Sequence, residues 1–197
     1  LYGQRGGIYM SEGGHEIRNN YGNLAAPADG YIWDFAARAG VSASLLSLAD
    51  FRLGFADGRP PDRLDDDTAK IVAALAEADA VLLASPVYRA SFTGALKNLL
   101  DLTPLETLRA KPIGIVAMGA SSHHYLGVDW HLRAVLAWFG ALVAPTSVYL
   151  ESAHFKDGRL ADADAVSALG DLVDTLLTMA GHPRDHLGPP PLAAGRG

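Results

Sequence analysis

The feature that most constrains the fold of this chain is an uninterrupted apolar run, AVLLAS, at Ala80–Ser85. A strand with one face in water alternates apolar and polar residues, whereas a parallel strand covered on both faces is apolar throughout. A second such run lies at Lys111–Met118, and Leu142–Leu150 and Val41–Leu48 predict further strands. These runs indicate a parallel sheet that is buried on both sides.

Segments with helical spacing of apolar residues alternate with these strands. We expect helices at residues 31–39, after the acidic cap Asp65–Asp67, after Gly94, at Leu126–Phe139 and at residues 162–180. Alternating strands and helices favour an α/β fold with a doubly wound parallel sheet. We expect one domain over residues 1–180, and a Pro/Gly-rich tail over residues 181–197.

Composition narrows the function classes. The 197 residues are 49% hydrophobic and carry a net charge of -6, which does not favour a nucleic-acid binder, since such proteins usually have a basic surplus. Gly, Pro or charged residues break the apolar stretches well short of a membrane span. Cysteine is absent, so a disulfide scaffold, a thiolate metal site and a cysteine nucleophile are excluded. Its absence fits a reducing compartment, and we expect a cytoplasmic location.

Two loops follow buried strands and are rich in small and hydroxyl residues. They are Pro86–Gly94 and Gly119–His124. In open α/β sheets, ligands bind outside the carboxyl ends of the strands, where these loops are expected. Small residues let backbone amides approach a ligand closely. The pattern is typical of a site for a flat, polar ring system.

The residues around both loops resemble those of a known family. The first segment matches the pattern P-x-Y-[KR]-A-S-[YF]-[ST]-G-x-L-K with Pro86, Tyr88, Arg89, Ala90, Ser91, Phe92, Thr93, Gly94, Leu96 and Lys97. The second corresponds to G-G-S-x-x-H-x-L-x-x-D-[YH]-x-L-[KR]-x-V-L, with departures at Ala120 and Trp130, through Gly119, Ala120, Ser121, His124, Leu126, Asp129, Trp130, Leu132, Arg133, Val135 and Leu136. Both patterns resemble the NAD(P)H-dependent FMN reductases, and most closely the reductase components of two-component flavin monooxygenases of the alkanesulfonate or EDTA type.

This resemblance implies a flavodoxin-like, five-stranded sheet of order 2-1-3-4-5, with FMN and either NADPH or NADH as cofactors. It implies that backbone amides of two segments bind the flavin ring, namely Pro86, Val87, Tyr88, Arg89, Ala90 and Ser91, and Gly119, Ala120 and Ser121. No catalytic side chain is expected, because the hydride passes directly between the two rings. Ala120 stands where the family has glycine, so a positive φ there would be strained and would change the loop.

The family pattern opens with a strand and a phosphate-binding loop, whereas here the first strand is expected to be truncated or divergent, with an atypical insertion at about residues 5–27. Gly3–Arg5 resembles a remnant of that loop, and Gln4, Arg5 and Ser11 are candidate phosphate ligands, with solvated loop residues as the alternative interpretation. Because the first strand is central in this fold, we expect residues upstream of Leu1, or an internal gap near the loop. The alternative is a diverged phosphate site that binds flavin weakly, differently or not at all.

Two further residue groups allow more than one interpretation. His123, His124 and His131 are clustered, but only Asp129 lies at ligand spacing, so no metal site is expected. His123 and His124 are instead interpreted as a loop pair near the flavin or as a subunit contact. The resemblance places Trp130 at a π-bulge near the flavin and a subunit interface; a plain core or interface tryptophan is the alternative. We expect a homodimer or homotetramer, with Trp130, Trp138, Phe139 and the tail as candidate contacts.

The sequence therefore favours an NAD(P)H:FMN oxidoreductase that supplies reduced flavin to a partner monooxygenase. A quinone, azo or nitro reductase on the same fold is the second interpretation. The third is a non-catalytic partner protein whose unusual N-terminal segment forms an interaction surface. The expected partners are flavin and nicotinamide, with no nucleic acid and no membrane.

Overall fold

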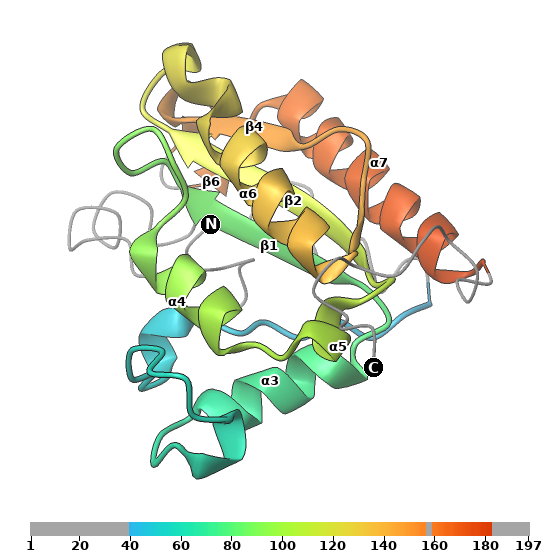
Figure 1. Cartoon of the computed structure of the whole chain (residues 1–197). Helices are drawn as coiled ribbons and strands as arrows, with labels where there is room; N and C mark the ends of the chain where they lie inside the picture. The colour runs from blue at the N-terminus through green and yellow to red at the C-terminus, as the bar shows by residue number, and fades with distance from the viewer. Residues whose placement is uncertain (1–39, 157–158, 183–197) are drawn as a thin grey trace.

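A computed structural model describes residues 40–156 and 159–182 (Figure 1). The main sheet contains β1 (Val81–Pro86), β2 (Pro112–Gly119), β3 (Leu142–Val143) and β4 (Val148–Glu151). The helices are α3 (Thr68–Glu77), α4 (Gly94–Leu102), α5 (Leu105–Leu108), α6 (Tyr125–Phe139) and α7 (Ala163–Ala180). A small antiparallel hairpin joins β5 (Phe155–Lys156) to β6 (Arg159–Leu160). The 3-10 turns are η1 (Leu48–Asp50), η2 (Pro61–Arg63), η3 (Ser122–His124) and η4 (Ser152–His154).

The sheet is parallel, as the two apolar runs predict. β1 pairs with one side of β2, and β3 and β4 both pair with the other side. Leu142–Leu150 is therefore two short strands in one position, interrupted before Val148 at a segment that contains Pro145, which has no N–H to donate to a ladder. The α/β architecture is confirmed, and the described residues form three strand positions of the five expected.

The prediction of a strand at Val41–Leu48 is wrong. Residues 41–47 have no regular structure and η1 begins at Leu48. The apolar side chains of this segment are nevertheless used, because Leu48 is buried and Leu45 and Leu46 pack against the core. The pattern reported burial, but a strand also needs a hydrogen-bonding neighbour, and among the described residues β1 pairs with β2 alone. The helix expected at residues 31–39 lies outside the described residues.

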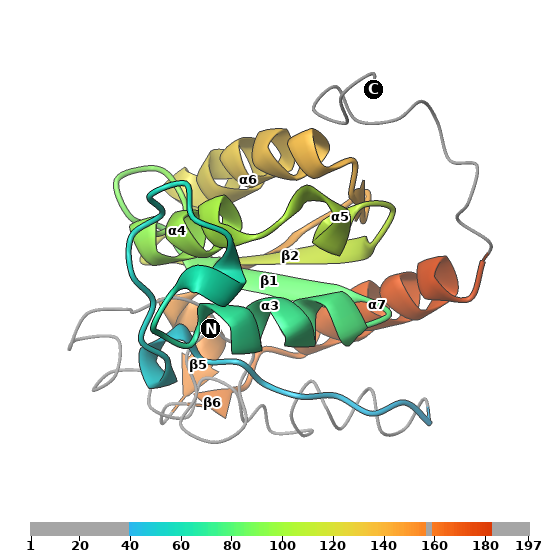
Figure 2. The same ribbon diagram turned by 60° about the horizontal axis from the view of Figure 1, so that its bottom comes forward.

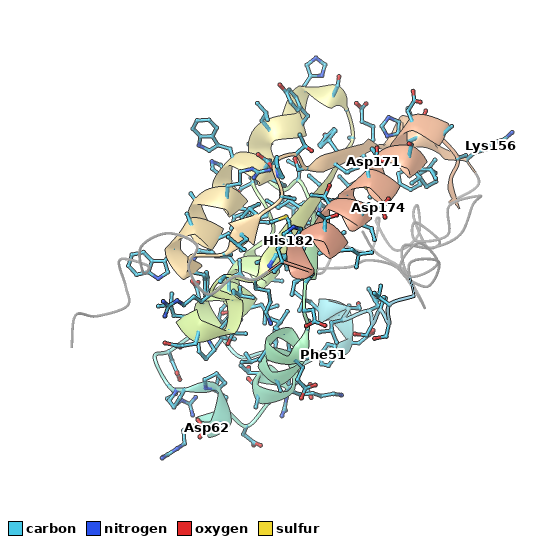
Figure 3. All side chains as sticks on the ribbon, turned by 90° about the vertical axis from the view of Figure 1, so that its right-hand side faces the viewer. Phe51, Asp62, Lys156, Asp171, Asp174 and His182 are labelled. Carbon is cyan, nitrogen blue, oxygen red and sulfur yellow. The ribbon has the colours of Figure 1, made fainter. Side chains whose placement is uncertain are left out.

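Helices cover both faces of the sheet. In Figure 2, α4 and α6 lie on one side and α7 on the other. α7 presses closely on β2, since a Cβ at Gly114 would lie 3.0 Å from Leu176 Cδ1. The outer face of α7 carries the exposed Asp171 and Asp174 (Figure 3). The helices predicted after Asp65–Asp67, after Gly94, at Leu126–Phe139 and at residues 162–180 are therefore confirmed as α3, α4, α6 and α7.

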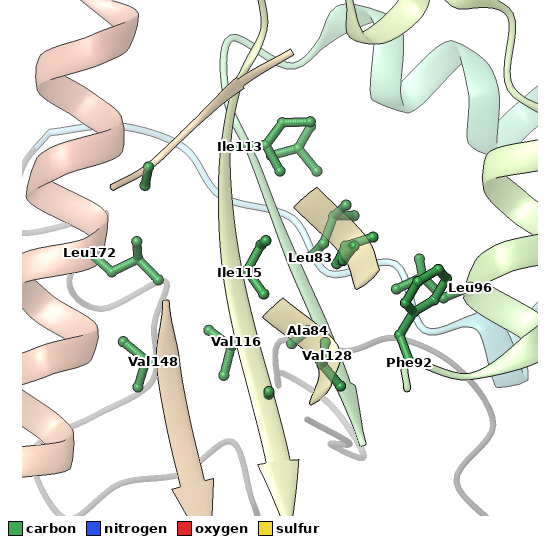
Figure 4. Packing of buried hydrophobic residues seen from close by; sticks show 14 of the residues in the cluster. Leu83, Ala84, Phe92, Leu96, Ile113, Ile115, Val116, Val128, Val148 and Leu172 are labelled. Carbon is green, nitrogen blue, oxygen red and sulfur yellow. The ribbon is translucent and has the colours of Figure 1, made fainter. Parts of the chain in front are cut away.

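The core lies on both sides of β2, as Figure 4 shows. Ile113 and Ile115 point toward Leu83 and Leu96, whereas Val116 points toward α7 and Leu172. Each fully buried aliphatic side chain stabilises the fold by roughly 1.5–3 kcal/mol relative to exposure. This two-sided burial fixes the ends of β1 and β2, and therefore the loops that follow them. Among the described residues, no helix is long and apolar enough to cross a membrane.

Candidate functional site

The two loops singled out in the sequence lie side by side. Pro86 is level with Met118 in the β1–β2 ladder, and the Val87 amide donates to the Met118 carbonyl at 2.7 Å. We call residues 87–93 the first loop and residues 120–124 the second loop. The structure thus brings Pro86–Ser91 together with Gly119–Ser121 at the carboxyl edge of the sheet, as the sequence predicts.

The first loop contains a two-residue turn at Arg89 and Ala90. The Tyr88 amide donates to the Ser91 carbonyl at 2.8 Å, and the Ser91 amide donates back to the Tyr88 carbonyl at 3.1 Å. Arg89 and Ala90 have φ values of 51° and 61°, a left-handed conformation that costs about 1 kcal/mol or more per non-glycine residue. Such strain often marks a binding site. Within the described residues, the amides of Arg89 and Ala90 donate no hydrogen bond, and both residues are exposed.

The base of the first loop is fixed by two buried hydroxyl residues. Ser85 Oγ accepts a hydrogen bond from the Thr93 amide at 3.0 Å and donates to the Pro86 carbonyl at 2.9 Å. Thr93 Oγ1 in turn accepts from the Leu96 amide, which caps α4. Sequence reasoning missed both supports. The preference of threonine for helix N-caps could have predicted the role of Thr93. No feature of the sequence predicts the role of Ser85.

Helix α6 packs against the turn. A Cβ at Gly127 would lie 2.8 Å from the Ala90 carbonyl oxygen, so only glycine lets the helix and the turn approach this closely. One helical turn later, His131 Nδ1 lies 2.9 Å from Ser91 Oγ. The sequence offers no local signal for this role of His131, because Ser91 and His131 lie 40 positions apart.

The second loop is held from β4 by Tyr149. The Tyr149 hydroxyl donates to the Ser121 carbonyl at 2.6 Å, and any Cβ at Gly119 would collide with that hydroxyl. Burial, with a smaller contribution from the charge of Glu151, raises the pKa of Tyr149 above its ordinary value, so the hydroxyl stays protonated and donating near neutral pH. Sequence reasoning missed Tyr149.

Ala120 causes no backbone strain. The described non-glycine residues with positive φ are Arg89, Ala90 and Ala110, so Ala120 adopts an ordinary conformation. The loop keeps its place through Tyr149 instead, and Ser121 Oγ also lies 3.2 Å from His123 Nδ1.

Other sequence expectations have mixed outcomes. Gln4, Arg5 and Ser11 lie outside the described residues, so the phosphate site stays a prediction. Residues 125–139 form a continuous α-helix, so the π-bulge expected near Trp130 is not formed. Trp130 is 72% exposed, which contradicts the plain core alternative. Across residues 40–156 and 159–182, there is no group of three or more His, Asp or Glu side chains that could hold a metal ion.

Comparison with known proteins gives a consistent result. The sequence profile of the family described as NADPH-dependent FMN reductase matches residues 28–155. An NAD(P)H-dependent FAD/FMN reductase of Geobacillus thermodenitrificans is 39% identical over 117 residues, which are 59% of this chain and 63% of the relative. The chain therefore spans less than two thirds of that relative's length.

Solved structures agree on the fold. The apo form of an NADH:FMN oxidoreductase, EmoB, is 30% identical with a TM-score of 0.54, covering 64% of this chain and 68% of that one. An archaeal flavodoxin has a TM-score of 0.56 at 11% identity, with 87% of this chain and 95% of that one covered. The second likeness shows a flavodoxin-like fold alone.

Proposed function

The chain belongs to the NADPH-dependent FMN reductase family, and from this premise we propose that it is an NAD(P)H:FMN oxidoreductase. The observation that carries the proposal is the junction of the first and second loops at the carboxyl edge of β1 and β2. Both segments that resemble flavin-binding loops lie there, and the Val87 amide bonds to Met118 near the end of β2, just before the second loop begins.

The groups at this junction suit the polar edge of a flavin ring. That edge carries carbonyl oxygens and ring nitrogens that accept hydrogen bonds, together with one N–H that donates. The amides of Arg89 and Ala90, which donate to no other described residue, are available donors, and the Ser91 hydroxyl is both donor and acceptor. Tyr88, 38% exposed, adds an aromatic surface beside the turn. The residues present therefore fit the ring of FMN.

Bound FMN supplies a ring nitrogen that takes a hydride from the nicotinamide of NADPH or NADH. The role of the protein is to bind and orient the two rings and to polarise the flavin. The turn amides, with the Arg89 side chain beside them, would offer positive charge to the ring edge, which would favour the reduced, electron-rich flavin. The loops are fixed in advance by Ser85, Thr93 and Tyr149, so little reorganisation is needed on binding. No side chain is assigned a proton-transfer role.

We extend the proposal to the rest of the fold. The five-stranded order 2-1-3-4-5 requires two strands beyond β1, and the parallel order of the described strands, with β1 first in that order, supports it. The single domain over residues 1–180, with Gln4, Arg5 and Ser11 at the FMN phosphate, belongs to the same proposal.

The proposed assembly is a homodimer or homotetramer that passes reduced flavin to a partner monooxygenase in the cytoplasm. Leu126, Trp130 and Trp138 lie at four- and eight-residue spacing along α6 and are 48%, 72% and 59% exposed. An apolar stripe of this kind supports a subunit interface. Analytical ultracentrifugation of Trp130→Ser tests it, with dissociation as the expected result and an unchanged mass as the contrary one.

The test of function is FMN titration by flavin fluorescence, followed by oxidation of NADH and NADPH with free FMN. Saturable binding with turnover supports the reductase. If turnover with quinone, azo or nitro compounds exceeds turnover with free FMN, the chain is instead a reductase of those compounds. A folded chain that neither binds FMN nor oxidises either nicotinamide overturns the proposal.

A further inference from the structure

We propose that His131 is a positioning residue for flavin, acting through Ser91. The inference rests on the proposed function and adds a residue that the family patterns do not specify. His131 lies on α6, Ser91 ends the turn of the first loop, and their side chains are 2.9 Å apart. Both belong to the exposed or half-buried surface around the junction of the two loops.

The turn needs support from outside itself. Its two central residues hold left-handed φ values without being glycine, and two backbone hydrogen bonds join Tyr88 to Ser91 across them. A strained turn persists when its surroundings fix it. α6 provides two such contacts, the Ala90 carbonyl against Gly127 and the Ser91 hydroxyl against His131. The first sets how closely the turn approaches, and the second is a directional bond at its end.

His131 also decides what the Ser91 hydroxyl offers to a ligand. When Nδ1 carries the ring proton it donates to Ser91 Oγ, and the hydroxyl hydrogen is free to donate elsewhere. When Nδ1 is bare, the hydroxyl donates to it, and the serine oxygen faces outward as an acceptor. The flavin edge contains both kinds of partner. The Ser91–His131 pair can therefore offer a ligand either a donor or an acceptor, whereas a turn amide can offer only a donor.

The experiment compares His131→Leu, His131→Asn, Ser91→Ala and the double variant Ser91→Ala/His131→Leu. Asparagine places an amide near the position of Nδ1 and restores a hydrogen bond, although leucine is the better helix former. The matched control is His182→Leu, which removes a surface imidazole bonded to the Thr178 carbonyl just beyond α7 (Figure 3). Two readouts are measured, the FMN dissociation constant and, without flavin, the rate of tryptic cleavage after Arg89.

We expect His131→Leu and Ser91→Ala each to weaken FMN binding about five-fold, the worth of one hydrogen bond. The double variant should be no weaker than the weaker single variant, because one contact is lost in all three. His131→Asn should recover most of the affinity. Cleavage after Arg89 should be faster in His131→Leu by a similar factor, since the turn opens more often.

Wild-type affinity and cleavage in His131→Leu would overturn the inference. So would effects of the two single variants that multiply, because His131 would then act independently of Ser91. If the wild-type chain binds no FMN, the proposed function fails together with the flavin part of this inference. The cleavage comparison then still decides whether His131 holds the turn.

Discussion

The first and second loops lie at the same edge of the same sheet, yet they keep their shapes by different means. The first loop is shaped by a turn with its own closed pair of hydrogen bonds, and α6 braces the left-handed residues Arg89 and Ala90 of that turn from outside. The second loop has no left-handed residue and depends on Tyr149, which reaches it from β4. A self-shaped loop should tolerate changes in the next strand, whereas a tethered loop should not.

We expect the largest loss of stability at Gly119, where the Tyr149 hydroxyl that holds the second loop leaves no room for a side chain. In Gly119→Ala, the new methyl group must displace the Tyr149 ring and break its bond to the Ser121 carbonyl. We expect the free energy of unfolding to fall by about 2–3 kcal/mol in urea titrations. Gly94→Ala is the control, because a Cβ there meets nothing within 4 Å.

A second variant separates the collision from other causes. Tyr149→Phe removes the hydroxyl that lies nearest the new Cβ, so adding Gly119→Ala to it should cost less than adding it to the wild type. Equal costs in both backgrounds would show that the second loop is not tethered in this way.

We expect the next largest loss of stability at Gly127, where α6 packs against the first loop. Alanine in place of a helical glycine usually stabilises a helix by about 1 kcal/mol. In Gly127→Ala, the Cβ would lie 2.8 Å from the Ala90 carbonyl oxygen, so we expect a net loss of about 1 kcal/mol and weaker FMN binding. Gly181→Ala is the control, since its Cβ would be 3.5 Å from the nearest atom. Stabilisation in both variants would mean that the turn yields easily.

The two loops also show what a sequence can predict. β1 and β2 were predicted because burial on both faces leaves an unbroken apolar run, and the loops followed from the strand ends. The strand at Val41–Leu48 was wrong because apolar spacing reports burial of Leu48 and not a hydrogen-bonding neighbour. The four-residue helix α5 was missed because it is shorter than the pattern that reveals helices.

The site residues divide along the same line. Those of the first and second loops were predicted because they are consecutive and chemically distinctive. His131 and Tyr149 were not, because they lie 40 and 28 positions from Ser91 and Ser121 and reach them only in the folded chain. Thr93 lies between these two cases, because its position just before helix α4 predicts its capping role from neighbouring residues alone.

A smaller effect is expected from Tyr149→Phe. Losing the bond to the Ser121 carbonyl should lower the free energy of unfolding by about 1 kcal/mol at pH 7. Because burial, and secondarily Glu151, raises the pKa of Tyr149 in the folded state, its contribution is fully present below its unfolded pKa of about 10. It is lost as pH rises through the folded pKa. Urea titrations from pH 6 to 11 should show a constant difference up to about pH 9. A difference that already shrinks between pH 7 and 9 would contradict this.

The smallest effects give the clearest contrast, because they differ in sign. Ala90→Gly relieves a left-handed residue, and the relief exceeds the entropy that glycine adds to the unfolded chain, for a gain of about 0.5 kcal/mol. Ala120→Gly relieves nothing and should lose about 0.5 kcal/mol. The two are measured together by urea titration, each serving as the other's control. Equal signs would place the strain elsewhere and remove the distinction between a self-shaped loop and a tethered one.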